Sequence, residues 1–261
     1  MEPIMRLALQ RFGAGRRNRP LPQPLPVSFA PPEPEMAVAV IGDVHGMIDP
    51  FLDLIAQIDN AAPQAAIVCV GDLVDRGEAS AAVLRHAHAC RDRLTVLRGN
   101  HEDMLIGFLD APAQEGPRWL NCGGLQTLAS FGIGGLGPAS GGARMEAAAA
   151  QLRAAIGPEI EAWLRALPRL WRSGTLVVTH AGADPLRPIE AQTESALSWG
   201  HPEFGRRARL DGLWIAHGHT IVADPVCADG IISVDTGAFS GGGLTAALIC
   251  PGNLRFLRVR S

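Results

Sequence analysis

Six short apolar runs, each followed at once by polar side chains, constrain this 261-residue chain more than any other feature. The runs are rich in valine, isoleucine and leucine and are too short for typical helices, so they predict buried strands. They are Met36 to Ile41 before Asp43 and His45, Ala65 to Val70 before Asp72, Asp75 and Arg76, Leu94 to Leu97 before Arg98, Asn100 and His101, Leu176 to Thr179 before His180, Leu213 to Ala216 before His217 and His219, and Ile231 to Val234 before Asp235. Ligand sites of layered α/β proteins lie beyond the carboxyl ends of strands, and all six polar segments fall there.

The chain is predicted to form one folded domain preceded by a tail. Arginine and proline dominate residues 1–35, which favours an extended, solvated chain of polyproline type. Residues 36–261 are enough to bury a sizeable core, and α/β proteins of this size commonly form one domain. Within them, residues 104–172 lack strand patterns, so we expect a mostly helical insertion beside the site.

Charge and cysteine usage exclude several classes of protein. A net charge of -3 gives no electrostatic basis for binding nucleic acid. No apolar run approaches the roughly 20 residues that span a bilayer, so no membrane span is expected. The five cysteines include no C-x-x-C pair, which indicates free thiols and a cytoplasmic protein. Every basic residue is arginine, a bias that suggests a GC-rich bacterial genome, and the sequence carries no signal for an oligomeric state.

The polar segments contain side chains suited to two divalent metal ions. Phosphoester hydrolysis needs a hydroxide at neutral pH and positive charge against the phosphoryl oxygens, and a pair of metal ions supplies both. The set mixes carboxylate, amide and imidazole groups without thiolates, which suits Mn²⁺, Fe or Zn²⁺ better than Ca²⁺ or Mg²⁺. The candidate ligands are Asp43, His45, Asp72, Asn100, His180 and His219. Asp72 is expected to bridge the ions, and Mn²⁺ is the metal expected first.

Two arginines and an acid pair complete the predicted site. Arg76 and Arg98 flank the ligand segments, and the planar guanidinium fork matches phosphate oxygens, so both are predicted to bind substrate. His101 follows a candidate ligand and is placed to protonate a leaving alkoxide, with Asp75 holding its other ring nitrogen. These residues together predict a metal-dependent phosphoester hydrolase.

The motifs GDVHG, GDLVDRG, RGNHE, TH before AG, GHT and DTGA resemble those of the calcineurin-like metallophosphoesterases, specifically the bacterial phosphoprotein phosphatases. The resemblance runs from about Ala37 to Arg258. It implies an α/β (α+β) fold, a four-layer αββα sandwich with a dinuclear metal site at the carboxyl ends of its strands. By the same resemblance, one ion binds Asp43, His45 and Asp72. The other binds Asp72, Asn100, His180 and His219, and His101 with Asp75 forms the acid pair.

The same motifs indicate which class of substrate is favoured. Related diadenosine tetraphosphatases usually read GDLVARG and GNHD, so Asp75 and Glu102 favour a serine/threonine protein phosphatase acting on a phosphorylated protein with a metal-bridging hydroxide. The alternative is a hydrolase of dinucleoside tetraphosphates or other small phosphoesters. A third, non-enzymatic reading is a pseudophosphatase that binds a phosphorylated partner without turnover.

One departure from the family pattern concerns a residue that binds the substrate phosphate. Close relatives commonly carry Trp-x-Arg-Glu before the last histidine, with the arginine on phosphate, whereas this chain has His201 at the arginine position. Either His201 binds phosphate itself, or an arginine among residues 206, 207 and 209 binds it, or the phosphate is bound more weakly and the preferred substrate differs. Alternation along a strand would also aim His217 and His219 toward one face, although only His219 matches a family ligand.

Overall fold

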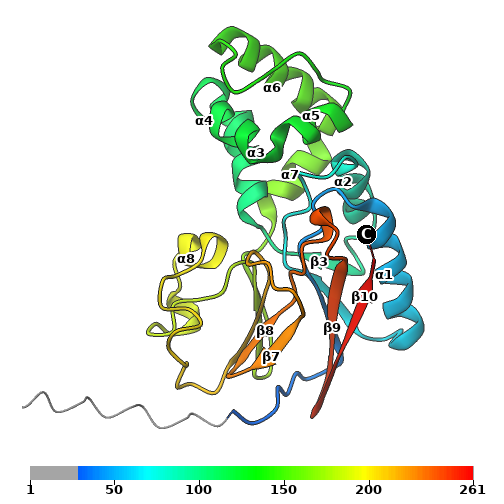
Figure 1. Ribbon diagram of the computed structural model, residues 1–261, viewed down its shortest axis with the longest axis vertical. Helices are drawn as coiled ribbons and strands as arrows, with labels where there is room; N and C mark the ends of the chain where they lie inside the picture. The colour runs from blue at the N-terminus through cyan, green and yellow to red at the C-terminus, as the bar shows by residue number, and fades with distance from the viewer. Residues whose placement is uncertain (1–28, 261) are drawn as a thin grey trace, which may run out of the picture.

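The computed structural model describes residues 29–260, which form two five-stranded sheets packed face to face with helices outside them (Figure 1). Sheet A has the strand order β10-β9-β1-β2-β3, and sheet B has the order β4-β5-β6-β8-β7. The strands are β1 (Val38–Ile41), β2 (Ala66–Cys69), β3 (Leu94–Val96), β4 (Leu170–Ser173), β5 (Leu176–Thr179), β6 (Trp214–His217), β7 (Val226–Ala228), β8 (Ile231–Ser233), β9 (Leu244–Cys250) and β10 (Asn253–Val259).

Three strands of each sheet run parallel to one another. In sheet A these are β1, β2 and β3, and in sheet B they are β5, β6 and β8. They correspond to the six apolar runs of the sequence. Parallel alignment brings their carboxyl ends to one edge of each sheet, so the polar segments that follow them are collected there. The remaining strands pair antiparallel at the sides of the sheets.

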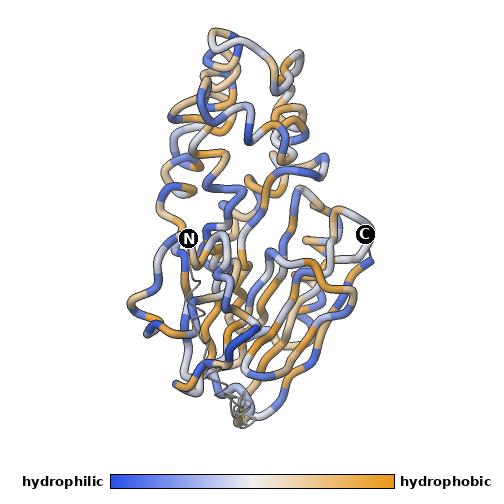
Figure 2. The backbone as a smooth tube through the Cα atoms, turned by 60° about the vertical axis from the view of Figure 1, so that its left-hand side comes forward, coloured by the Kyte–Doolittle hydropathy of each residue, from blue (hydrophilic) through white to orange (hydrophobic). Residues whose placement is uncertain are grey.

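The core between the sheets is made of short apolar side chains that alternate along each strand. Val40 and Val68 of sheet A pack in the same cluster as Val178 and Ile232 of sheet B, all with no exposed surface. Figure 2 shows the strands as largely apolar segments in the lower half of the molecule. Burial of both faces explains why these strands read as continuous apolar runs.

Helices cover the outer faces of both sheets and extend beyond them. The helices are α1 (Ile48–Ala61), α2 (Ser80–Ala89), α3 (Asn100–Asp110), α4 (Pro112–Trp119), the π-helical η1 (Leu120–Gly124), α5 (Leu125–Ser130), α6 (Gly142–Ile156), α7 (Pro158–Ala166), the 3-10 turn η2 (Ile189–Ala191), α8 (Glu194–Trp199) and the 3-10 turn η3 (Ala238–Ser240). The first two helices pack on sheet A, and α8 packs on the outer face of sheet B. Between residues 100 and 166, consecutive helices form the upper part of the molecule in Figure 1.

The predicted fold class is confirmed, because two mixed sheets with helices on their outer faces make the α+β sandwich that the motifs implied. The sequence patterns did not anticipate the antiparallel hairpin of β9 and β10. Of the arginine- and proline-rich tail predicted for residues 1–35, residues 1–28 lie outside the described residues. None of the helices in the described part of the chain has the length and apolar character needed to cross a membrane.

Candidate active site

The structure brings all six candidate metal ligands together at the carboxyl ends of the parallel strands. Sheet A contributes four of them, from the segments that follow β1, β2 and β3, and sheet B contributes two, from the segments after β5 and β6. The six are Asp43, His45, Asp72, Asn100, His180 and His219, called here the six-residue cluster. All are buried except His219, which is partly exposed.

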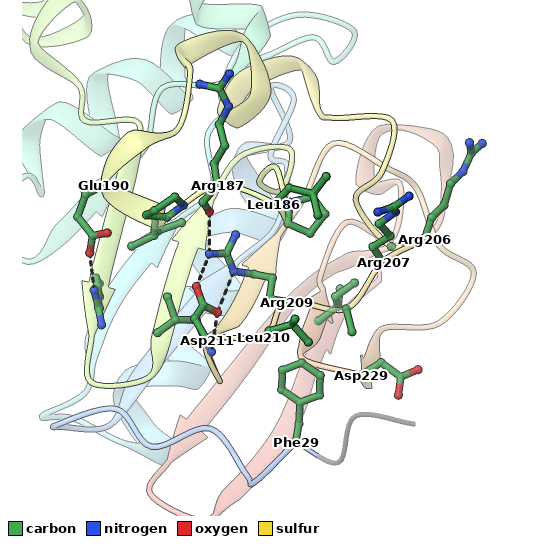
Figure 3. Close-up of a pocket in the computed structure, with 18 residues that line it drawn as sticks. Phe29, Leu186, Arg187, Glu190, Arg206, Arg207, Arg209, Leu210, Asp211 and Asp229 are labelled. Atoms are coloured by element: carbon green, nitrogen blue, oxygen red, sulfur yellow. Dashed lines mark hydrogen bonds and ion pairs between the residues drawn. The ribbon is translucent and has the colours of Figure 1, made fainter. Parts of the chain in front are cut away.

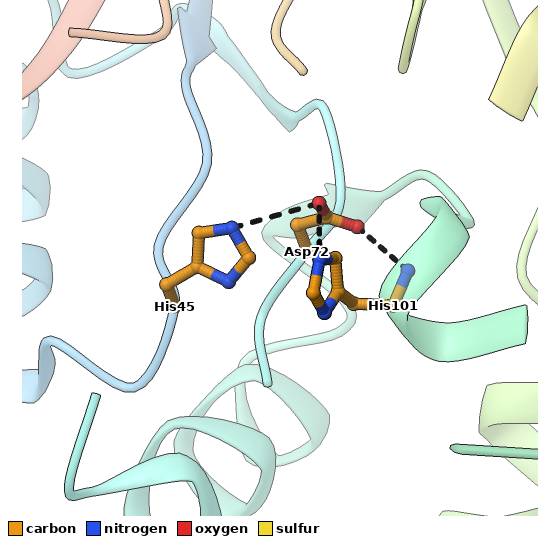
Figure 4. A group of neighbouring side chains, drawn as sticks. All are labelled: His45, Asp72 and His101. Atoms are coloured by element: carbon orange, nitrogen blue, oxygen red, sulfur yellow. Dashed lines mark hydrogen bonds and ion pairs between the residues drawn. The ribbon is translucent and has the colours of Figure 1, made fainter. Parts of the chain in front are cut away.

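Asp72 lies at the centre of this cluster and belongs to two groups of possible metal donors. One group contains His45, Asp72 and His101 (Figure 4), and the other contains Asp72, His180 and His219; within each group the donor atoms lie within 4.8 Å of one another. The Asp72 Oδ2 atom is 3.6 Å from His45 Nε2 and 3.4 Å from His180 Nε2. A carboxylate in this position is able to bridge two ions.

Two of the histidines are oriented by hydrogen bonds to the main chain. The Nδ1–H groups of His45 and His180 donate to the carbonyl oxygens of Val74 and Val70, at 2.8 and 3.1 Å. This leaves each Nε2 lone pair facing Asp72, the arrangement in which a protein fixes an imidazole as a metal ligand. Burial lowers the pKa of both imidazoles well below the ordinary value, so they are neutral and free to coordinate.

The Asn100 side chain lies beside the sheet B histidines. Its Oδ1 is 2.8 Å from His180 Nε2 and 2.9 Å from His219 Nδ1. The three groups therefore point at one another from α3 and from the ends of β5 and β6. Convergence of an amide oxygen and two imidazole nitrogens on one point is the pattern expected around a cation.

The carboxylates of the site are crowded, and this supports the fit to divalent metal. Burial, and then the charge of Asp235, raise the pKa of Asp43 well above its ordinary value. Burial, and then Asp43, do the same for Asp72. Buried carboxylates that repel one another are stabilised by a cation between them. The donor chemistry and this charge conflict together suit a pair of divalent ions.

Backbone strain is concentrated in the same segments. Among the described residues, those other than glycine with positive φ are His45, Asp72, Asp75, Arg76, His219 and Asp229, with values from 46° to 71°. All but the last belong to the predicted site. Left-handed backbone costs such residues of order 1 kcal/mol or more each and persists where function requires it.

Two glycines allow the carboxylates to reach their positions. A Cβ atom at Gly99 would overlap the Asp72 carboxylate, and one at Gly218 would overlap the Asp43 carboxylate. Both glycines have ordinary backbone angles, so the requirement is space and not conformation. Each buried carboxylate thus lies in a cradle that only glycine leaves open.

Glu102 supports the loops from beneath the cluster. It is fully buried, and its carboxylate accepts hydrogen bonds from the backbone N–H groups of Asp72, Leu73 and Gly99, at 2.7 to 2.9 Å. The sequence motif had suggested a link between this glutamate and substrate preference. Because all these hydrogen bonds go to backbone, Glu102 holds the GDLVDRG and RGNHE segments in register with each other.

Glutamine in place of Glu102 is expected to lower the free energy of unfolding by about 2 kcal/mol, because its amide nitrogen would face a buried backbone donor. Urea unfolding of the metal-free protein measures the loss. Glu115→Gln, on the exposed side of α4, is the matched control and is expected to change stability by less than about 0.5 kcal/mol. Equal, small effects of the two substitutions would contradict the supporting role of Glu102.

His101 and Asp75 form the pair that the sequence predicted. His101 Nδ1 lies 2.7 Å from Asp75 Oδ2, and His101 Nε2 lies 3.9 Å from Asp72 Oδ2. Burial raises the pKa of Asp75 to about 7, while burial and the Arg76 charge lower the pKa of His101 to about 3. Asp75 also accepts hydrogen bonds from Trp119 Nε1 and Thr127 Oγ1. No local sequence pattern around Trp119 or Thr127 indicates a link to Asp75.

Arg76 lies at the mouth of the cluster. One of its guanidinium nitrogens is 3.3 Å from His101 Nε2, and its Cζ lies 4.6 Å from the centroid of the Phe239 ring. The edge of the same ring meets His45, with centroids 5.1 Å apart. Sequence patterns missed Phe239, although it follows the DTGA motif directly. The contact aligns a guanidinium toward the space in front of the cluster.

Arg98 is not brought to the cluster, in contrast to its predicted role in binding phosphate. Its Nε lies 2.7 Å from the Asp103 carboxylate, and its Nη1 donates to the carbonyl of Arg165. Asp103 also pairs with Arg169, which reaches Glu194 and Ser198 on α8. The Arg98 side chain therefore contacts α3 and α7, and these contacts do not support its predicted role in binding substrate phosphate.

His201 is paired with Asp184, at 3.7 Å from Nε2 to the carboxylate, and its Nδ1 accepts from the backbone N–H of Glu203 at 3.3 Å. Arg209 is buried, forms an ion pair with Asp211 and donates to the carbonyl oxygens of Asp184 and Arg187. Both side chains therefore already have partners among residues 184–187 and 203–211.

Nor do the neighbouring arginines face the cluster. Arg206, Arg207 and Arg209 line a separate pocket of about 1360 Å³ formed by the chain around residues 185–190 and 205–213 (Figure 3). Arg207 pairs with Glu203. None of the six cluster residues lines this pocket. The arginines proposed to reach back to phosphate therefore lie in a different region of the described structure.

His217 and Asp235 are the other polar residues that follow the parallel strands. His217 bonds Ser233 through Nε2 and packs against Phe204, so it does not share a face with His219. The predicted alternation fails because β6 ends at His217 and His219 has a left-handed backbone. Asp235 accepts from the Gly237 N–H and lies against Asp43, which places it beside the cluster.

Comparison with known proteins agrees with this geometry. The family model described as calcineurin-like phosphoesterase matches residues 36–223. A relative from Aromatoleum aromaticum is 29% identical over 185 residues, covering 69% of this chain and 57% of the relative. Another, from Nitrosococcus oceani, is 32% identical over 152 residues, covering 58% of this chain and 45% of the relative. Both are named symmetrical bis(5'-nucleosyl)-tetraphosphatase, and the chain spans about half of their length.

Among solved structures, a cold-active protein-tyrosine phosphatase of a psychrophile Shewanella shares the fold. Its TM-score is 0.60 at 18% identity, covering 86% of this chain and 80% of that structure. Fold and cluster together define an α+β protein with a candidate dinuclear metal centre. The family match over most of the described residues makes the assignment specific: the chain belongs to the calcineurin-like phosphoesterase family.

Proposed function

We propose that this protein is a metal-dependent hydrolase of dinucleoside tetraphosphates. The observation that carries the proposal is the convergence of two groups of possible metal donors on one shared carboxylate, Asp72. Arg76 lies beside this cluster, where it contacts His101 and Phe239 and has no carboxylate partner among the described residues. A pair of divalent ions, when bound there, supplies an activated water molecule and neutralises charge on the phosphoryl group. The metal identity proposed first is Mn²⁺, with Fe or Zn²⁺ as alternatives.

The protein side chains have separate roles in this proposal. Arg76 binds the non-bridging oxygens of the phosphoryl group that is cleaved, because its guanidinium is held by a neutral ring instead of a carboxylate. Asp75 orients His101, whose Nε2 faces the space between Asp72 and Arg76. A phosphate dianion entering this space stabilises the protonated imidazole, which then donates its proton to the leaving oxygen.

The choice of dinucleoside tetraphosphates over phosphoproteins is supported by the names of the relatives and by the contacts of Glu102. Relatives from several bacteria are named symmetrical bis(5'-nucleosyl)-tetraphosphatase, which matches the alternative that the sequence left open. One of the two residues that favoured a protein phosphatase, Glu102, contacts backbone groups of the loops. It therefore carries little information on substrate.

Turnover by the purified protein at excess Mn²⁺ tests the proposal on diadenosine tetraphosphate, a phosphoserine peptide and an aryl phosphate. The value of kcat/KM on the tetraphosphate is expected to exceed that on the phosphopeptide. The reverse order would replace the proposal with the second candidate, a serine/threonine protein phosphatase, which Asp75 still favours. Bound metal without turnover on any of the three substrates would indicate a protein that binds a phosphorylated partner without catalysis.

Alanine in place of Phe239 is expected to raise KM about fivefold, because Arg76 loses a cation–π contact worth about 1 kcal/mol. Steady-state kinetics on the aryl phosphate measure the change. Phe239→Tyr retains the ring and is expected to keep KM near the wild-type value. A KM that stays constant in the alanine variant would show that the ring does not position Arg76.

A further inference from the structure

A second arginine lies over an aromatic ring at the point where the end of α4 meets the end of α8. The Cζ atom of Arg118, at the end of α4, lies 4.5 Å from the centroid of the Trp199 ring, at the end of α8. The two residues are far apart in sequence: Arg118 belongs to the segment from α4 through η1, called here the first wall, and Trp199 to the end of α8, called the second wall. Their meeting is a feature of the tertiary structure alone.

The first wall connects Arg118 to the acid pair. Its chain neighbour, Trp119, donates a hydrogen bond to Asp75, at 3.0 Å. Four residues farther on, the carbonyl of Gly123 accepts from the backbone N–H of Arg76, at 3.3 Å. The segment from α4 through η1 therefore runs along the side of the site that holds Asp75 and Arg76, and Arg118 lies within it, in the last turn of α4.

The second wall connects Trp199 to the sheet B ligands. The backbone N–H of Ala181, next to the candidate ligand His180, donates to the carbonyl of Leu197 at 2.7 Å. Ser198 donates to the carbonyl of Arg98, two residues before Asn100. The end of α8 is thus fastened beside two cluster segments, and Trp199 follows directly, with 38% of its surface exposed.

The guanidinium of Arg118 is available to an anion. Within residues 29–260, Arg118 has no carboxylate within ion-pair distance, and its side chain is exposed. The other arginines near this end of α8 are already paired, since Arg98 and Arg169 both bind Asp103. A ring face holds a guanidinium without neutralising its charge and leaves the N–H groups at its edge free.

We propose that Arg118, held on Trp199, binds a second phosphate of the substrate, one or more positions along the chain from the phosphoryl group that is cleaved. This inference rests on the proposed function, because only a polyphosphate substrate presents such a group. In this proposal Arg118 takes the phosphate-binding role that the sequence placed near His201. His201 and Arg209 already have other partners, and Arg206 and Arg207 line a separate pocket. Arg76 and Arg118 then bind two different phosphates of one extended anion.

The test compares Arg118→Ala with Arg85→Ala. Arg85 is a matched control, since it is also exposed and also lies over an aromatic ring, with its Cζ 5.4 Å from the Phe131 centroid on the far side of α2 and α5. The first readout is the ratio of kcat/KM on diadenosine tetraphosphate to kcat/KM on an aryl phosphate, at fixed excess Mn²⁺. The ratio is expected to fall about tenfold in Arg118→Ala, the effect of losing one charged hydrogen-bond partner, and to stay at the wild-type value in Arg85→Ala.

The second readout is binding of a methylene-bridged, non-hydrolysable analogue of diadenosine tetraphosphate, measured by calorimetry. Arg118→Ala is expected to weaken this binding about tenfold, with Arg118→Lys intermediate because a point charge replaces the planar fork. Equal affinity of wild type and Arg118→Ala overturns the inference, whether or not the wild type hydrolyses the tetraphosphate. Absence of turnover by a wild type whose affinity for the analogue depends on Arg118 overturns the proposed function alone.

Discussion

Asparagine in place of Asp72 is expected to abolish the binding of both metal ions and to lower kcat/KM by about a thousandfold. Asp72 is the carboxylate common to both donor groups, so its loss affects each ion. Metal ions supply several kcal/mol of transition-state stabilisation in such sites, and about 4 kcal/mol corresponds to three factors of ten in rate. Elemental analysis of the purified variant measures the metal, and aryl phosphate turnover measures the rate.

The stability of the metal-free variant distinguishes loss of metal from loss of folding. Burial and the neighbouring Asp43 make the Asp72 carboxylate costly without a cation, so the asparagine variant is expected to unfold at the same temperature as metal-free wild type or higher. Asp110→Asn, in the half-exposed ion pair with Arg165, is the matched control and is expected to keep both metals. Unchanged metal content in Asp72→Asn would contradict its assignment as the bridge.

Asparagine in place of His101 is expected to lower kcat on alkyl phosphates by about a thousandfold, within the range for loss of a general acid. The Asp75 carboxylate, 2.7 Å from Nδ1, orients the imidazole so that its Nε2 faces the space in front of Asp72. Aryl phosphates with good leaving groups need less protonation, so their kcat is expected to fall far less. Parallel kinetics on an alkyl and a nitrophenyl phosphate measure the difference.

The control for this prediction is His88→Asn. His88 lies on α2 with its ring 5.5 Å from that of Trp163, in the helical part of the molecule, and its loss is expected to leave both rates unchanged. Equal losses on the two substrates in His101→Asn would remove the proton-donating role. In that case a role as metal ligand would remain, because His101 also belongs to the donor group of His45 and Asp72.

The sequence predicted the strands that end in polar segments far better than those that do not. The run Leu176 to Thr179 matches β5 residue for residue, and the other five runs overlap their strands. The hairpin of β9 and β10 was missed. Alanines weaken the strand pattern of β9, and β10 lies at the sheet edge with Arg255 and Arg258 among its residues, so neither resembles a buried parallel strand.

Much of the candidate site was also within reach of the sequence. Each of the six cluster residues follows an apolar run within a few positions, and parallel pairing within the sheets is enough to collect them. The roles of Arg98 and His217 could not be predicted from the sequence. Arg98 turns to Asp103 and His217 to Ser233, and both choices depend on partners that the local sequence does not reveal.

The sequence by itself determined which chemical groups this protein brings to the ends of its strands: carboxylates, imidazoles and an amide that suit two divalent ions. That is possible because strand direction and side-chain type are local properties. Only the tertiary structure decided which partners the arginines meet. Arg98, near the candidate ligand Asn100, pairs with Asp103, whereas Arg118, far from every motif, meets the Trp199 ring at the end of α8. The direction of a long side chain depends on neighbours from distant segments, and these segments meet only in the folded chain.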